Sequence, residues 1–138
     1  LMEYSMNHIL YEEFGEEKAN DLFRKAGFLA GSEYAQNMLP LDKDMTTFLA
    51  ALQESLKELK IGILRMEELE EASGKFILTV AQDLDCSGLP PTNEVVCNFD
   101  EGFIAGIMKA YTGAEYEVRE VDCWASGARA CRFQGEPK

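Results

Sequence analysis

Apolar residues recur at steps of three and four along much of the chain, and this spacing places them on one face of a helix. The clearest stripe runs from Met45 to Leu59 and follows Asp42 and Asp44, either of which can cap a helix. Pro40 ends the preceding stripe, because a proline disfavours helical geometry in the residue before it. The pattern predicts helices over four ranges, which are 7–14, 16–39, 45–59 and 98–112.

Two glycines lie four residues apart in the second of these helices. Gly27 and Gly31 therefore fall on the same helical face. Either they let another backbone approach closely at that face, or they are simply tolerated within a packed helix. The sequence leaves both interpretations open.

Elsewhere the apolar spacing changes to two residues, which is typical of strands. The acidic run 67–71 and the following 72–74 predict the turn of a first hairpin, and Ser126 with Gly127 predicts the turn of a second. The strands are predicted over 61–66, 75–81, 115–123 and 128–133. The order is helices, hairpin, helix, hairpin. It predicts an α+β fold with N-terminal helices packed on one face of an antiparallel sheet of about four strands.

The composition is that of a single globular domain covering residues 1–138, with 46% apolar and 28% charged residues. Thirteen basic against 25 acidic residues give a net charge of −12, which disfavours nucleic acid and anionic membrane surfaces as direct partners. No apolar run is long enough for a membrane span, and no secretory signal is visible. The expected compartment is the cytoplasm, where thiols stay reduced.

Three cysteines and one glutamate near the C-terminus have the spacing of a metal site. Cys123 and Cys131 each lie four residues from Gly127, so a regular hairpin sets them opposite each other, with Cβ atoms about 5 Å apart. Cys97 precedes a predicted helix N-terminus, where the helix dipole favours a thiolate, and Glu120 supplies a carboxylate. Three thiolates and one carboxylate suit zinc, and a site with four protein ligands is closed and structural.

The spacing alone leaves two alternatives, which are a disulfide between Cys123 and Cys131 and buried thiols that only pack. The zinc interpretation also carries a geometric condition. Residues three apart on a regular strand face opposite sides, so Glu120 and Cys123 share a metal only if the strand is irregular near Val121 and Asp122. We predict that irregularity.

The sequence holds no motif that indicates catalysis. Cys86 lies in a Gly/Pro-rich loop, and the only histidine, His8, is far from it in the first predicted helix, so a Cys–His nucleophile is disfavoured. Phosphate-binding loops and the common hydrolase and metalloprotease motifs do not occur. No catalytic residue is assigned, and Cys86 receives no role.

At these residues the chain resembles the 4-vinyl reductase (4VR) domain family. The family pattern is a Cys before an aromatic–Gly–Ala–Gly helix, then Glu-x-x-Cys, a Gly turn and a final Cys before an aromatic residue. Residues 95–106 fit the first part, 118–124 with Gly127 fit the second, and 131–133 fit the end. The preceding 86–90 also fits. The resemblance covers most of the chain and is most specific in its last third.

The resemblance implies a fold shared with NO-signalling sensors and Golgi-transport (TRAPP) subunits, and a homodimer formed through the N-terminal helices. It also implies zinc bound by Cys97, Glu120, Cys123 and Cys131, as in the sensor domains of phenol- and xylene-responsive activators. In those sensors an aromatic effector lies beside the zinc hairpin, held partly by a His and a Trp. Here Trp124 is the only tryptophan, and no histidine lies in this part of the chain.

The expected function is therefore a zinc-containing sensing domain that binds a small hydrophobic or aromatic ligand and signals through a dimer or an attached domain. Its cavity is expected to measure about 300–1,000 Å³. The alternatives are a tetrapyrrole vinyl-reductase enzyme or accessory protein, for which no flavin or nicotinamide motif is present, and a structural dimerisation scaffold. The residues expected to line the cavity are Phe48, Phe76, Phe99, Phe103, Met108, Tyr111 and Trp124.

Overall fold

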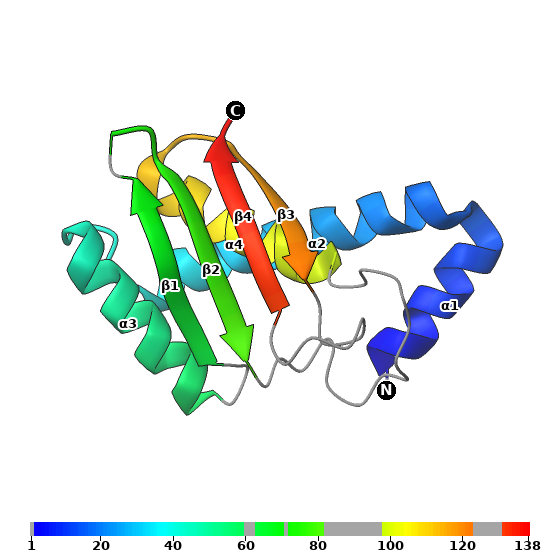
Figure 1. The fold of residues 1–138 in the computed structure, drawn as a ribbon. Helices are drawn as coiled ribbons and strands as arrows, with labels where there is room; N and C mark the ends of the chain where they lie inside the picture. The colour runs from blue at the N-terminus through cyan, green and yellow to red at the C-terminus, as the bar shows by residue number, and fades with distance from the viewer. Residues whose placement is uncertain (1, 60–62, 71, 82–97, 123–130) are drawn as a thin grey trace.

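The fold is a four-stranded antiparallel sheet in the order β1-β2-β4-β3, with helices behind one of its faces (Figure 1). The computed structural model describes residues 2–59, 63–70, 72–81, 98–122 and 131–138. The helices are α1 (Met2–Phe14), α2 (Glu16–Met38), α3 (Met45–Glu58) and α4 (Asn98–Thr112). The strands are β1 (Ile63–Glu70), β2 (Lys75–Ala81), β3 (Tyr116–Asp122) and β4 (Cys131–Pro137). The predicted α+β class and antiparallel sheet are confirmed.

The helices end at the residues that the sequence marks as breakers. Gly15 separates α1 from α2 with a φ of 85°, a left-handed conformation that glycine adopts at no steric cost. Pro40 follows the end of α2 by two residues. α1 begins at Met2, five residues before the predicted start, and α4 covers its predicted range.

β1 runs further than predicted. It continues to Glu70, so most of the acidic run lies in a strand and not in a turn, and the prediction of a turn there was wrong. Leu69 is half-buried and pairs with Phe76, whereas Glu67 and Glu68 are exposed. An edge strand with one solvated face tolerates such carboxylates, because only its inward positions must be apolar.

The main core lies between the inner face of the sheet and helices α3 and α4. Phe48 of α3, Phe76 of β2 and Phe133 of β4 are among its largest fully buried side chains. α4 also packs against α2, so it lies between the sheet and the long N-terminal helix (Figure 1). The helix that begins next to Cys97 is thus the centre of the fold.

α2 and α4 pack backbone against backbone. A Cβ atom added at Gly27 would collide with the carbonyl oxygen of Phe99, and one added at Gly31 would collide with that of Phe103. Gly102 of α4 lies in the same way against the backbone of α2. The interpretation of the glycine pair as a close backbone contact is therefore confirmed.

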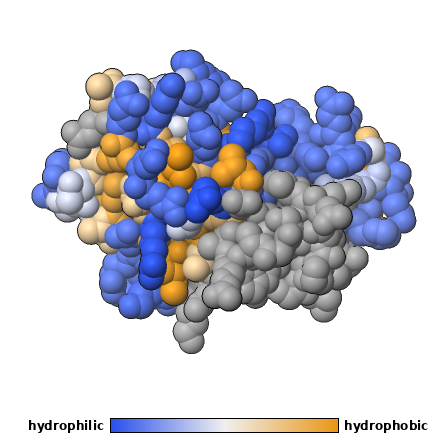
Figure 2. Space-filling view, viewed as in Figure 1, coloured by the Kyte–Doolittle hydropathy of each residue, from blue (hydrophilic) through white to orange (hydrophobic). Residues whose placement is uncertain are grey.

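The outer face of the sheet is mostly polar, with apolar residues between the charged ones (Figure 2). Arg132 of β4 forms an ion pair with Glu67 of β1, with Nε 3.2 Å from Oε2. Arg119 pairs with Glu117 on β3 at 3.0 Å, and both side chains are half-exposed. Within the described part of the chain, no helix combines the length and apolarity that crossing a membrane requires.

Candidate metal and ligand sites

Glu120 and Cys131 lie on the inner face of two neighbouring strands. On β3 the buried positions alternate as Tyr116, Val118 and Glu120, and on β4 they begin with Cys131. Cys131 has no exposed surface, and Glu120 is only 8% exposed although it carries a carboxylate. A charged group buried in this way needs partners for its oxygens, so the inner end of this strand pair is a chemically demanding position.

The β3–β4 ladder changes register at this position. Glu120 pairs with Phe133, but Asp122 pairs with Arg132, so Val121 is inserted on β3 and is half-exposed. Such a bulge bends the strand and re-aims the side chains next to it. The irregularity that the zinc interpretation requires is confirmed. The pair of Asp122 and Arg132 also has the register, symmetric about Gly127, that the predicted hairpin needs.

The other two expected zinc ligands, Cys97 and Cys123, lie outside the described residues, as do Cys86 and Trp124. In the ranges that are described, no group of three or more His, Cys, Asp or Glu side chains is arranged to hold a metal ion. The described donors are compatible with zinc in kind, since a buried thiol and a buried carboxylate on one face supply the sulfur and oxygen atoms that it accepts.

Glu101 connects this strand to the helices, and the sequence interpretation missed it. It is 4% exposed, and it lies on α4 three and four residues before the buried Ile104 and Ala105. Arg24 of α2 donates from Nε to Oε1 of Glu101 at 2.7 Å, and the backbone N–H of Glu120 donates to Oε2 at 2.8 Å. The signal for this residue was an acidic side chain within an otherwise apolar helical stripe.

A second polar link joins the three helices near the start of α4. Asn98 is 5% exposed, and its Nδ2 donates to Oδ1 of Asn20 on α2 at 2.9 Å. The hydroxyl of Tyr11 on α1 donates to the same oxygen at 2.6 Å. Since Asn98 directly follows Cys97 in the chain, both α1 and α2 are tied to the residue next to an expected ligand.

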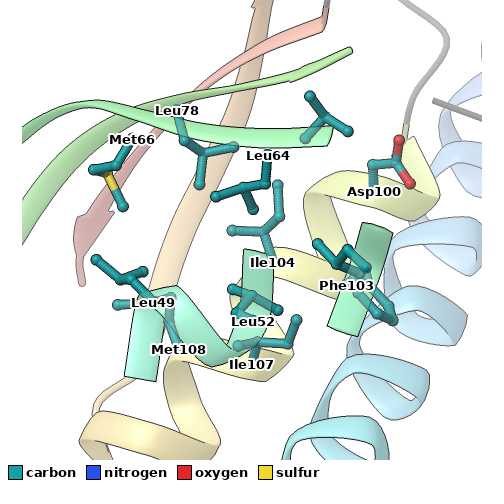
Figure 3. Close-up of a pocket in the computed structure, with 12 residues that line it drawn as sticks. Leu49, Leu52, Leu64, Met66, Leu78, Asp100, Phe103, Ile104, Ile107 and Met108 are labelled. Atoms are coloured by element: carbon teal, nitrogen blue, oxygen red, sulfur yellow. The ribbon is translucent and has the colours of Figure 1, made fainter. Parts of the chain in front are cut away.

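A narrow apolar cavity of about 40 Å³ lies between α3, α4, β1 and β2 (Figure 3). Among the described residues, Asp100 at the start of α4 is the one charged residue that borders it. Its volume is well below the expected few hundred Å³, because the side chains of α3 and the sheet close on each other. The residues that line it are Leu49, Leu52, Leu56, Leu64, Met66, Leu78, Val80, Asp100, Phe103, Ile104, Ile107 and Met108.

The residues expected to line a pocket occupy several places. Phe103 and Met108 border the cavity. Phe48 stacks on Tyr111 with ring centroids 4.0 Å apart, and the Tyr111 hydroxyl donates to the carbonyl oxygen of Lys43 at 2.6 Å. Two more aromatic contacts complete the set, namely Phe99 on Phe103 at 6.2 Å and Phe76 beside Tyr116 at 5.8 Å.

The leucines of the cavity wall came from elements that the sequence interpretation assigned to packing. Leu49, Leu52 and Leu56 belong to the α3 stripe, which was expected to form a core or a dimer interface. Leu64 and Leu78 face them from β1 and β2. Periodicity identifies such residues as inward-facing but does not show where the opposing surfaces leave a gap.

The part of the chain that carries the expected metal ligands matches a known family. The model of the vinyl-4-reductase (4VR) domain matches residues 76–137. The match contains β2, α4, β3 and β4, together with the four expected zinc ligands. The family resemblance noted in the sequence is confirmed.

The likeness to solved structures extends over nearly the whole chain. The phenol-responsive sensory domain of the transcription activator PoxR, solved with phenol, has a TM-score of 0.76 and 19% identity over 96% of this chain and 71% of that chain. A trafficking protein particle complex subunit 3 from Naegleria fowleri, covalently bound to palmitic acid, has a TM-score of 0.73 and 9% identity over 99% and 93%. At these identities the likeness shows a shared fold.

A curated relative outside the solved structures is an uncharacterised protein of Methanocaldococcus jannaschii. It is 27% identical over 103 residues, which cover 75% of this chain and 58% of the relative. The chain thus spans less than two thirds of that relative's length. Helices α1–α3 and β1 precede the range that the family model matches, so structural likeness relates them to known proteins.

Proposed function

We propose that this chain is a ligand-sensing domain that takes a small apolar molecule into the cavity between α3, α4 and the sheet. The observation that carries the proposal is the cavity itself, which is bordered by eleven apolar residues and a single carboxylate among the described residues. The fold shared with a phenol-responsive sensory domain supports it. At about 40 Å³ the cavity admits a ligand only if α3 moves outward from the sheet, and that movement supplies the signal.

A zinc ion bound by Cys97, Glu120, Cys123 and Cys131 is the second part of the proposal. The buried thiol and carboxylate on one face and the bulge at Val121 support it. With four protein ligands the ion has a structural role, since no position stays open for a substrate. It would hold the β3–β4 hairpin against α4, which forms one wall of the cavity.

Dimerisation through the N-terminal helices is the third part. α1 lies beyond the β3 side of the sheet (Figure 1) and carries Ile9 and Phe14, each 51% exposed. Leu29 and Met38 of α2 are 61% and 57% exposed. A second copy would cover such an apolar surface, and ligand-induced movement would reach the partner or an attached domain through it.

The test measures metal, ligand and oligomeric state on the same purified chain. We expect about one zinc per chain by elemental analysis, a dimer by light scattering, and an increase in melting temperature with phenol or with palmitic acid. A dimer that binds neither probe would favour the scaffold function. Reduction of a tetrapyrrole vinyl group in an anaerobic assay would favour the enzyme.

A further inference from the structure

Glu101 is a buried charge at a junction of three elements. Carboxylates are seldom fully buried unless they are paired, and this one is 4% exposed on the central helix α4. Its two oxygens are divided between two other elements, since Oε1 accepts from Arg24 of α2 and Oε2 accepts from the backbone of β3. The side chain therefore links α2 to β3 through α4.

The contact on β3 falls at the position where the strand needs it. β3 is an edge strand of the described sheet, so the N–H groups on its open side have no strand partner there. Glu101 accepts the N–H of Glu120, one residue before the inserted Val121. A bulge next to an open edge has few contacts to hold it, and a short hydrogen bond to an ionised carboxylate is among the strongest available.

The contact on α2 anchors Glu101 to a helix that has little freedom to move. Arg24 is 35% exposed, so its stem lies along α2 while its Nε reaches the buried carboxylate at 2.7 Å. Gly102, the next residue of α4, packs against the backbone carbonyl of Arg24 itself. Any shift of Arg24 along α2 therefore displaces Glu101, and through it the backbone of Glu120.

From this geometry we infer that Glu101 is a positioning residue that ties the backbone of Glu120 to Arg24, so that zinc affinity depends on the packing of α2. The inference rests on the proposed zinc site, for which Glu120 is an expected ligand. Groups that orient a metal ligand typically change metal affinity by about 10- to 100-fold when they are replaced. Because binding couplings are reciprocal, zinc would also tighten the α2–α4 contact.

The test compares Glu101→Gln with Glu117→Gln, which removes the same charge from an exposed ion pair on the outer face of β3. Zinc affinity is measured by competition with a chromophoric chelator, and hydrogen exchange of the Glu120 amide is measured by NMR. We expect Glu101→Gln to weaken zinc binding about 10- to 100-fold and to speed exchange at Glu120. Glu117→Gln should leave both unchanged.

The outcomes separate the inference from the zinc proposal. Wild-type zinc affinity and unchanged Glu120 exchange in a folded Glu101→Gln variant would overturn the inference alone. A wild-type chain that binds no zinc would overturn the metal site, and the inference with it. If Glu101→Gln does not fold, Arg24→Lys replaces it, because it keeps the charge but loses the Nε donor, and zinc affinity equal to wild type would then contradict the inference.

Discussion

Gly27 of α2 lies directly against the carbonyl oxygen of Phe99 on α4, without room for a methyl group between them. We expect Gly27→Ala to destabilise the fold by about 1–3 kcal/mol, because the neighbouring atom is backbone and the helices must separate. Denaturant unfolding measures this. Gln36→Ala on the exposed side of α2 is the control and should change the free energy of unfolding little. A fully stable Gly27→Ala variant would mean that the two helices slide freely.

Cys131 is expected to be essential for metal binding as well as for packing. Cys131→Ser should lower the zinc content from about one ion per chain to almost none, because a thiolate ligand is lost. A serine in this fully buried position also destabilises the fold without any metal. The decisive measurement is therefore the effect of a chelator on the melting temperature, which should be large in the wild type and absent in Cys131→Ser.

Cys86→Ser is the matched control for that measurement, because Cys86 is not among the expected ligands. It should bind zinc and respond to the chelator as the wild type does. A chelator effect that disappears in Cys86→Ser but persists in Cys131→Ser would show that the ligand set is wrong.

Leu52 tests the cavity. Leu52→Ala should cost about 2–5 kcal/mol of stability, because a buried leucine is removed beside an existing gap. It also enlarges the apolar space, so phenol should raise the melting temperature of the variant more than that of the wild type. Calorimetric scans with and without phenol measure both effects. Leu59→Ala, which removes a half-exposed leucine just after α3, should show neither.

Tyr116 makes stability depend on alkaline pH. Burial raises its pKa above the ordinary value of 10.0. Below that value the tyrosine is protonated in both the folded and the unfolded chain. As pH rises above about 10, the unfolded chain ionises first, so stability falls until the folded-state pKa is passed. Tyr116→Phe should remove this part of the decline, as measured by unfolding between about pH 8 and about pH 11.

Much of the fold could be predicted from the chain's periodicity. The helix over 98–112 and the breaks at Gly15 and Pro40 were predicted because propensity and local geometry decide them. The end of β1 was not, since the acidic run is stable as a strand only when β2 pairs with it and the other face meets water. Pairing partners that are distant in sequence leave no local pattern.

The candidate site divides in the same way. The bulge at Val121 could be predicted because it follows from the spacing of Glu120 and Cys123 once a shared metal is assumed. Glu101 could not, because its partners Arg24 and Glu120 are 77 and 19 residues away in the chain. The cavity also escaped prediction, since its size depends on how closely α3 approaches the sheet.

By itself, the sequence determined the α+β class, the four helices, the cysteine and glutamate spacing and the family resemblance, because each is written in local periodicity or in a fixed motif. Only the tertiary structure decided which buried charge links α2 to β3, how tightly the glycine faces meet and how small the apolar cavity is. Those features are sums of contacts between distant segments. Sub-ångström differences in packing change them while the pattern of residues stays the same.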